Sequence, residues 1–88
     1  MQVRINKEAR NDFKNLDPSL QHAFQEEKKS LKAWPATSGV KHLTDRWKGF
    51  CRTKLLENWR IIFRIIPSEA HPDHITVVRI RHRSVVYK

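Results

Sequence analysis

Residues 51–66, CRTKLLENWRIIFRII, alternate cationic and apolar side chains over much of their length. Strand side chains point alternately to the two faces of a sheet, and β-branched and aromatic residues favour strands. We therefore predict strands over 50–56 and 59–66. A tight turn at Glu57-Asn58 is expected to join them, because Asn58 tolerates positive φ. This hairpin must bury one apolar face, which leaves its cations on the other.

Strand alternation places the hairpin cations together, away from the predicted core: Arg52, Lys54, Arg60 and Arg64. A third strand over 74–82 adds Arg79 and Arg81. Alternation puts these two on the face of Ile75 and Val77. One register gathers all six cations on a single concave surface, and the residues just past its end are His82, Arg83 and Tyr87. Cations interleaved with apolar groups suit phosphate binding and base stacking, although a merely solvated face is the alternative.

The N-terminal half predicts a short strand at Val3-Arg4-Ile5 and two helices, over 7–16 and 18–32. Asp17 is expected to cap the second helix, with Pro18 at its first position. Residues 36–49 are expected to be irregular. The order β-α-α-β-β-β predicts an α+β fold, in which two N-terminal helices pack on one face of a small, mainly antiparallel sheet.

Length and hydropathy limit the class of protein. The 88 residues contain no internal repeat, so we expect residues 1–88 to form one domain. No run approaches the roughly 18 apolar residues of a membrane span, and the N-terminal segment lacks the apolar core of a signal peptide. We therefore expect a cytoplasmic protein with no membrane partner.

The charge balance predicts an anionic partner. Eighteen Lys and Arg against nine Asp and Glu give a net charge of +9. This excess favours nucleic acid, then an acidic protein, then an anionic membrane surface. No cofactor or metal site is expected, because His71 and His74 lack the spacing of a zinc site. Cys51, the only cysteine, is interpreted as a buried strand residue and not as a nucleophile.

Three segments together resemble the RelE/ParE superfamily of bacterial type II toxins: LDPSLQHAFQEEKKSLKAWP, GVKHLTDRWKGFCRTKLLENWRIIFRI and ITVVRIRHRSVVY. The resemblance implies the family fold, a cognate antitoxin as partner, and a RelE-like mRNA interferase. Such toxins cleave mRNA in the ribosomal A site without a metal. The alternative is a ParE-like toxin, which shares the fold, inhibits DNA gyrase and lacks the full basic cluster. A nucleic-acid-binding module without toxicity is a third hypothesis.

The resemblance also implies site residues. The RelE-type Lys-x-Lys corresponds to Arg52-Thr53-Lys54, and the arginine of the next strand corresponds to Arg60. The late tyrosine corresponds to Tyr87, and the C-terminal arginine to either of two positions, Arg81 or Arg83. Arginine replaces the first lysine of the pattern, and His82 stands where other members carry various residues, so the general base stays open.

The chemistry assigns the expected roles. Cleavage through the 2′-hydroxyl of RNA needs a base, an acid and fixed positive charge at the phosphorane. Arg60, with Arg81 or Arg83, is expected to supply the charge. The acid–base candidates are Lys54, His82 and Tyr87. The residues expected to bind RNA are Arg52, Lys54, Arg64, Arg79 and Lys48.

Overall fold

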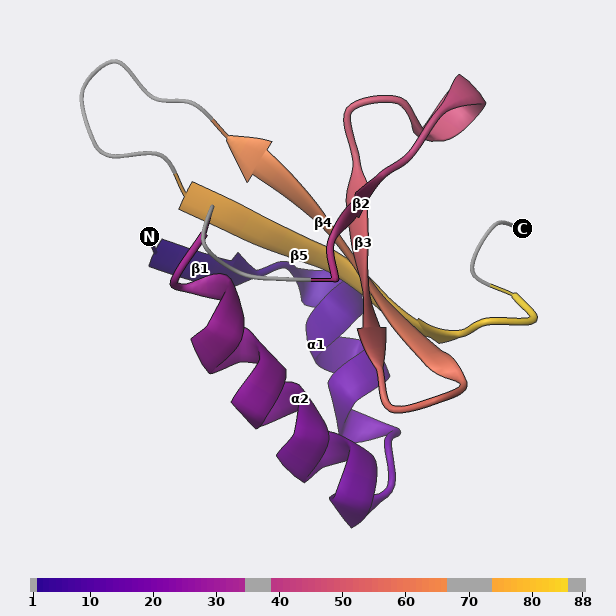
Figure 1. Ribbon diagram of the computed structural model, residues 1–88. Coiled ribbons are helices and arrows are strands. Elements are labelled where there is room, and N and C mark those ends of the chain that lie inside the picture. Colours follow the sequence, from indigo (N-terminus) through magenta and orange to yellow (C-terminus); the bar gives the residue numbers. More distant parts are fainter. Residues whose placement is uncertain (1, 35–38, 67–73, 86–88) are drawn as a thin grey trace.

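Figure 1 shows the computed structural model, which describes residues 2–34, 39–66 and 74–85. Both helices pack on one face of a five-stranded sheet, so the predicted α+β fold is confirmed. The elements are β1 (Gln2–Ile5), α1 (Lys7–Lys14), α2 (Pro18–Leu31), β2 (Lys41–His42), a 3-10 helix (Asp45–Trp47), β3 (Cys51–Leu55), β4 (Trp59–Ile66) and β5 (His74–His82).

The sheet has the strand order β1-β5-β4-β3-β2. β1 is parallel to β5, and the other neighbouring strands are antiparallel. β4 is therefore the central strand, with β5 on one side and β3 on the other. Within the described ranges, no helix has the length and apolar content needed to span a bilayer.

The helices begin where the sequence predicts. The Asp17 carboxylate accepts a hydrogen bond of 2.9 Å from the backbone N–H of Leu20, which caps α2 ahead of Pro18. Asn6 caps α1 in the same way, by accepting from the N–H of Ala9 at 2.9 Å. α1 ends two residues earlier than expected, at Lys14 and not at residue 16.

The core lies between the helices and one face of the sheet. The buried residues that form it are Ala9, Leu16, Leu20, Phe24, Leu31, Cys51, Leu55, Ile61, Phe63, Ile75, Val77 and Ile80. Trp59 is half-buried against this cluster, on the face that alternation predicts. Ile62 is fully buried but outside the cluster, because it lies on the opposite face beside the cations.

Two local features differ from the prediction. Lys41 and His42 form a short strand, β2, within the segment expected to be irregular. The β3–β4 hairpin has a three-residue loop, 56–58, closed by the pair Leu55 and Trp59. The expected two-residue turn at Glu57-Asn58 is therefore wrong. The residue with positive φ is Leu56, at 55°, and not Asn58.

Leu56 gives a stability prediction. A left-handed conformation costs a non-glycine residue about 1–2 kcal/mol, and asparagine tolerates it better. The Leu56 side chain is 58% exposed, so it contributes little to the core. We expect Leu56→Asn to stabilise the protein by about 0.5–1 kcal/mol, which raises Tm by about 3–6 °C. Glu57→Asn, at the next loop position, should leave Tm unchanged. A lower Tm for Leu56→Asn would show that the leucine side chain stabilises this loop.

Candidate functional site

Three cations lie opposite one another on neighbouring strands: Lys54 pairs with Arg60, and Arg60 pairs with Arg81. We call Lys54, Arg60 and Arg81 the cation row. Each is followed or preceded by a buried core residue, so the row lies on the face away from the helices. Directly opposed residues have Cβ atoms about 4.5–5.5 Å apart, where like charges destabilise a sheet. An anion bound across the row would remove that repulsion.

The Arg60 side chain is held by the hairpin backbone. Its Nη1 donates to the carbonyl oxygens of Trp59, at 2.8 Å, and Glu57, at 3.1 Å. These bonds fix the position of the guanidinium and use only one of its terminal nitrogens. The Nε and Nη2 donors, which form the edge suited to a bidentate grip on phosphate, take no part in them.

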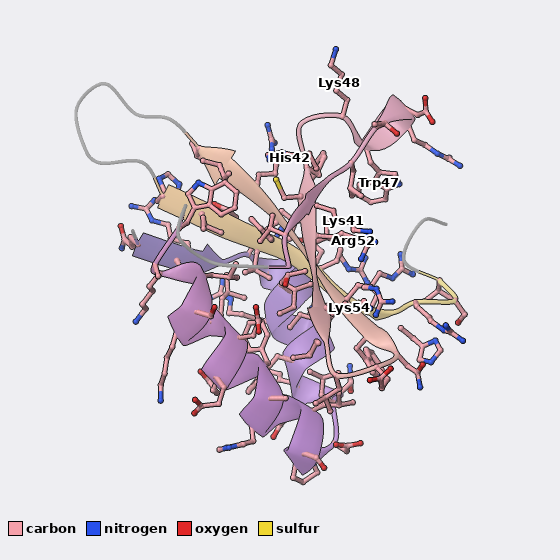
Figure 2. The ribbon with its side chains drawn as sticks, viewed as in Figure 1. Lys41, His42, Trp47, Lys48, Arg52 and Lys54 are labelled. Atoms are coloured by element: carbon pink, nitrogen blue, oxygen red, sulfur yellow. The ribbon has the colours of Figure 1, made fainter. Side chains whose placement is uncertain are left out.

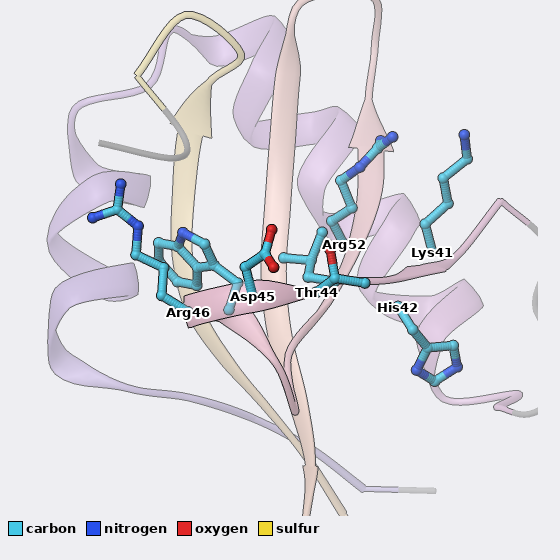
Figure 3. A pocket seen from close by; sticks show the side chains of 8 residues that line it. Lys41, His42, Thr44, Asp45, Arg46 and Arg52 are labelled. Carbon is cyan, nitrogen blue, oxygen red and sulfur yellow. The ribbon is translucent and has the colours of Figure 1, made fainter.

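A second pair of cations extends the row toward the edge of the sheet. Arg52 on β3 lies opposite Lys41 on β2, and both side chains extend in the same direction in Figure 3. Lys41, Arg52 and Lys54 lie close together in Figure 2. The sequence prediction missed Lys41, because a strand of two residues has too short an alternation to be recognised.

Arg64 lies farther along β4, and Lys48 lies outside the sheet. The Arg64 guanidinium sits over the Phe50 ring, 5.1 Å from its centre. The Phe50 ring in turn packs edge-to-face against the Trp47 ring, with the two ring centres 5.4 Å apart. Lys48 is exposed and projects away from the sheet at the far end of the β2–β3 connection (Figure 2). The structure therefore does not bring Lys48 to the cation row.

Arg79 does not join the row, and its predicted place is wrong. Its Nε and Nη2 donate to the two carboxylate oxygens of Asp12 on α1, at 2.9 and 3.1 Å. The cause is a bulge in β5: Ile62 pairs with Arg79 and Phe63 with Val77, which leaves one extra residue on β5. Before the bulge the odd-numbered residues of β5, such as Ile75 and Val77, face the helices. After the bulge an even-numbered residue, Ile80, does so.

Asp12 holds this bulge in place. Besides Arg79, its carboxylate accepts a hydrogen bond of 2.9 Å from the backbone N–H of Ile80. Its hydrogen bond and charge raise the pKa of Arg79 above the ordinary value, against the opposing effect of burial. Because Ile80 and not Arg79 enters the core, the next residue, Arg81, comes to lie beside Arg60.

His82 also lies apart from the cations, contrary to the prediction. It pairs with Trp59, on the helix side of the sheet, and the two rings meet edge-to-face at 5.5 Å. Its Nδ1 accepts from the backbone N–H of Ser84 at 3.2 Å, and the Ser84 Oγ lies 2.8 Å from the same nitrogen. A backbone N–H can only donate, so the neutral imidazole carries its proton on Nε2. No role at the cation row follows for His82.

The residues after β5 complete the list of candidates. The backbone N–H of Arg83 donates to the carbonyl oxygen of Asn58 at 2.8 Å, and the Arg83 side chain is exposed. This bond ties the end of β5 to the hairpin loop. Tyr87 lies outside the described residues.

The comparison with known families decides the identity. Residues 3–87 match the sequence profile of the family described as the ParE toxin of the type II toxin–antitoxin system parDE. The chain belongs to this ParE toxin family. The resemblance to the RelE/ParE superfamily is thereby confirmed. Among curated proteins, none matches the chain.

Solved structures share the fold of this ParE-family toxin. The YoeB/ParE toxin from Agrobacterium tumefaciens is 16% identical, with 93% of this chain and 98% of that chain covered, and a TM-score of 0.76. RelBE2, a toxin–antitoxin complex from Mycobacterium tuberculosis, gives 23% identity, 93% and 96% coverage, and a TM-score of 0.75. YafQ from Escherichia coli gives 13% identity, 99% and 98% coverage, and a TM-score of 0.76. At these identities the likeness concerns the fold.

Cys51 of this toxin is a core residue, as predicted. It is 2% exposed, and its Sγ lies 3.3 Å from Nδ1 of His42. Burial raises the pKa of the Cys51 thiol, which disfavours the reactive thiolate. The described residues hold no group of three or more His, Cys, Asp or Glu side chains that could bind a metal ion.

Proposed function

We propose that this ParE-family toxin cleaves RNA without a metal, by attack of the RNA's own 2′-hydroxyl on the adjacent phosphate. The observation that carries the proposal is the cation row, in which Lys54, Arg60 and Arg81 lie opposite one another on three neighbouring strands. Positive charge of this density, placed on rigid strands, suits the charge that develops at phosphorus in the transition state.

The proposed reaction balances without a co-reactant. The 2′-oxygen loses its proton and forms a bond to phosphorus, which gives a pentacoordinate phosphorane. The bond from phosphorus to the 5′-oxygen then breaks, and that oxygen takes up a proton. The products are one fragment with a 2′,3′-cyclic phosphate and one with a 5′-hydroxyl.

The row residues divide these tasks. Arg60 and Arg81 neutralise the non-bridging phosphoryl oxygens, because arginine stays charged and can bind two oxygens at once. Lys54, which is exposed and opposite Arg60, is the candidate for proton transfer among the described residues. Tyr87 keeps its predicted acid–base role as part of this proposal.

The partners follow from the resemblance and the charge. We assign the mRNA in the ribosomal A site as the substrate, and the cytoplasm as the place of action. A cognate antitoxin is the expected inhibitor, since the structures that share this fold include toxin–antitoxin complexes from Mycobacterium tuberculosis and Staphylococcus aureus. The net charge of +9 favours an acidic antitoxin segment.

The chemistry is tested by the ends of the RNA fragments. Purified toxin is incubated with mRNA on ribosomes, and we expect fragments with 5′-hydroxyl ends that polynucleotide kinase labels without prior phosphatase treatment. A matched mRNA with 2′-O-methyl groups at the cleavage site should stay intact, because it lacks the attacking hydroxyl. Fragments with 5′-phosphate ends would overturn the mechanism, and intact mRNA in both cases would overturn the enzymatic function.

Inhibition of DNA gyrase is the second candidate. The chain belongs to the ParE toxin family, and the resemblance to ParE-like toxins implies this activity. A supercoiling assay separates the two. Relaxed plasmid left unsupercoiled by gyrase in the presence of the toxin, together with untouched RNA, would favour this second function.

A further inference from the structure

A hollow of about 430 Å³ lies on the cationic face beside the row, at the β2–β3 connection. Its wall is formed by Lys41, His42, Leu43, Thr44, Asp45, Arg46, Trp47 and Arg52. This volume is within the range of pockets that bind small organic groups. Arg52 links the hollow to the cation row, since it shares a strand and a face with Lys54, about 7 Å away. A single-stranded RNA held at the row can therefore reach the hollow with a neighbouring base.

Asp45 is the unusual residue of this hollow. Among the described residues, its carboxylate makes no ion pair and accepts no hydrogen bond, although Lys41 and Arg52 line the same hollow. It is turned to the same side as those two cations in Figure 3. Its backbone is in the left-handed region, with φ at 57°. The Asp45 side chain is exposed, and aspartate adopts this backbone region more readily than most residues, so its carboxylate is open to a ligand that donates hydrogen bonds.

A second polar group in the wall also lacks a partner. The indole Nε1 of Trp47 is buried and has no hydrogen-bond acceptor among the described residues. Buried donors without acceptors are rare and commonly occur at functional positions. The hollow thus combines the carboxylate acceptors of Asp45 with donors on Arg52 and Lys41.

We propose that this hollow is a nucleobase subsite that selects guanine, with Asp45 as its specificity-determining residue. Guanine alone of the four RNA bases presents two adjacent N–H donors, N1–H and N2–H, on its Watson–Crick edge. One carboxylate accepts both at once. Adenine and cytosine place a ring acceptor beside their amino group, and uracil places a carbonyl on each side of its single N–H. Each of these would set an acceptor against the Asp45 carboxylate.

The cations complete the complementarity. Arginine and lysine are the side chains that pair with the O6 and N7 acceptors of guanine. Arg52 and Lys41 line the same hollow as Asp45, and their side chains point to the same side of the sheet (Figure 3). The assignment rests on the proposed function, since it takes the ligand of this face to be single-stranded RNA. It adds which base the face reads and which residue reads it.

Binding to uncleavable RNA tests the subsite separately from catalysis. The probes are fluorescent 2′-O-methyl pentamers, UUGUU, UUAUU, UUCUU and UUUUU, which cannot undergo attack by a 2′-hydroxyl. Anisotropy titrations of the whole toxin should give a Kd for UUGUU about tenfold or more below the other three. Asp45→Asn keeps the size of the side chain and tolerates the left-handed backbone. It should reduce the guanine preference to within about twofold.

Glu26→Gln is the matched control, because it makes the same change of charge on the exposed surface of α2, where Glu26 pairs with Lys29. This variant should keep the guanine preference, and circular dichroism should show all three proteins folded. Equal binding of the four pentamers by the wild type would overturn the subsite. So would a guanine preference that persists in Asp45→Asn. A guanine preference in a toxin that leaves natural RNA uncut would uphold the subsite and overturn the proposed enzymatic function.

Discussion

Arg60→Ala is expected to slow RNA cleavage by about 10²–10³-fold, which corresponds to about 3–4 kcal/mol of transition-state stabilisation. Arg60 is the central member of the cation row, opposed by Lys54 on one side and Arg81 on the other. Its guanidinium is already positioned by the two hairpin carbonyls, so little reorganisation is needed when charge develops on the phosphate. The measurement is the single-turnover rate of mRNA cleavage on ribosomes.

Two further variants make this result specific. Arg60→Lys keeps the charge but loses the planar pair of donors, so its rate should fall between those of wild type and Arg60→Ala. Arg10→Ala removes the same charge from the exposed surface of α1, on the other side of the sheet, and should cleave at the wild-type rate. If Arg60→Ala cleaves as fast as Arg10→Ala, the cation row is not the catalytic site.

Strand alternation was enough to predict part of this site. The apolar residues of β4 alternate with Arg60 and Arg64, so burying Ile61 and Phe63 necessarily turns the arginines outward. The cap of α2 was equally predictable, because the Asp17-Pro18 pair acts through contacts within one turn. Predictions of this kind depend on residues that are close in sequence.

The sequence could not predict which residues of β5 face the helices. The bulge at residues 78–79 depends on Asp12, which is 67 residues away from Arg79 in the chain. Nothing in the strand HITVVRIRH marks where an extra residue is inserted, so an uninterrupted alternation placed Arg79 on the same face as Arg81. Lys41 was missed for a related reason, since β2 exists only through its pairing with β3.

Asp12→Ala is expected to destabilise the toxin by about 2–3 kcal/mol. The substitution leaves the N–H of Ile80 without its acceptor and the Arg79 guanidinium without its counter-charge. The value stays below that of a fully buried pair because the Arg79 side chain is 36% exposed. For a chain of this size, Tm should fall by about 10–20 °C. Glu8→Ala, in the exposed first turn of the same helix, should change stability by less than about 1 kcal/mol.

Asp12→Ala should also slow RNA cleavage at temperatures where the variant is folded, because the bulge that Asp12 holds sets the position of Arg81. A double-mutant cycle separates this effect from lost stability. In an Arg81→Ala background, Asp12→Ala should cost the same stability but cause no further loss of cleavage rate. If it slows cleavage equally in both backgrounds, Asp12 does not act through Arg81. If Asp12→Ala cleaves at the wild-type rate, the position of Arg81 does not depend on the carboxylate, and the bulge has a structural role alone.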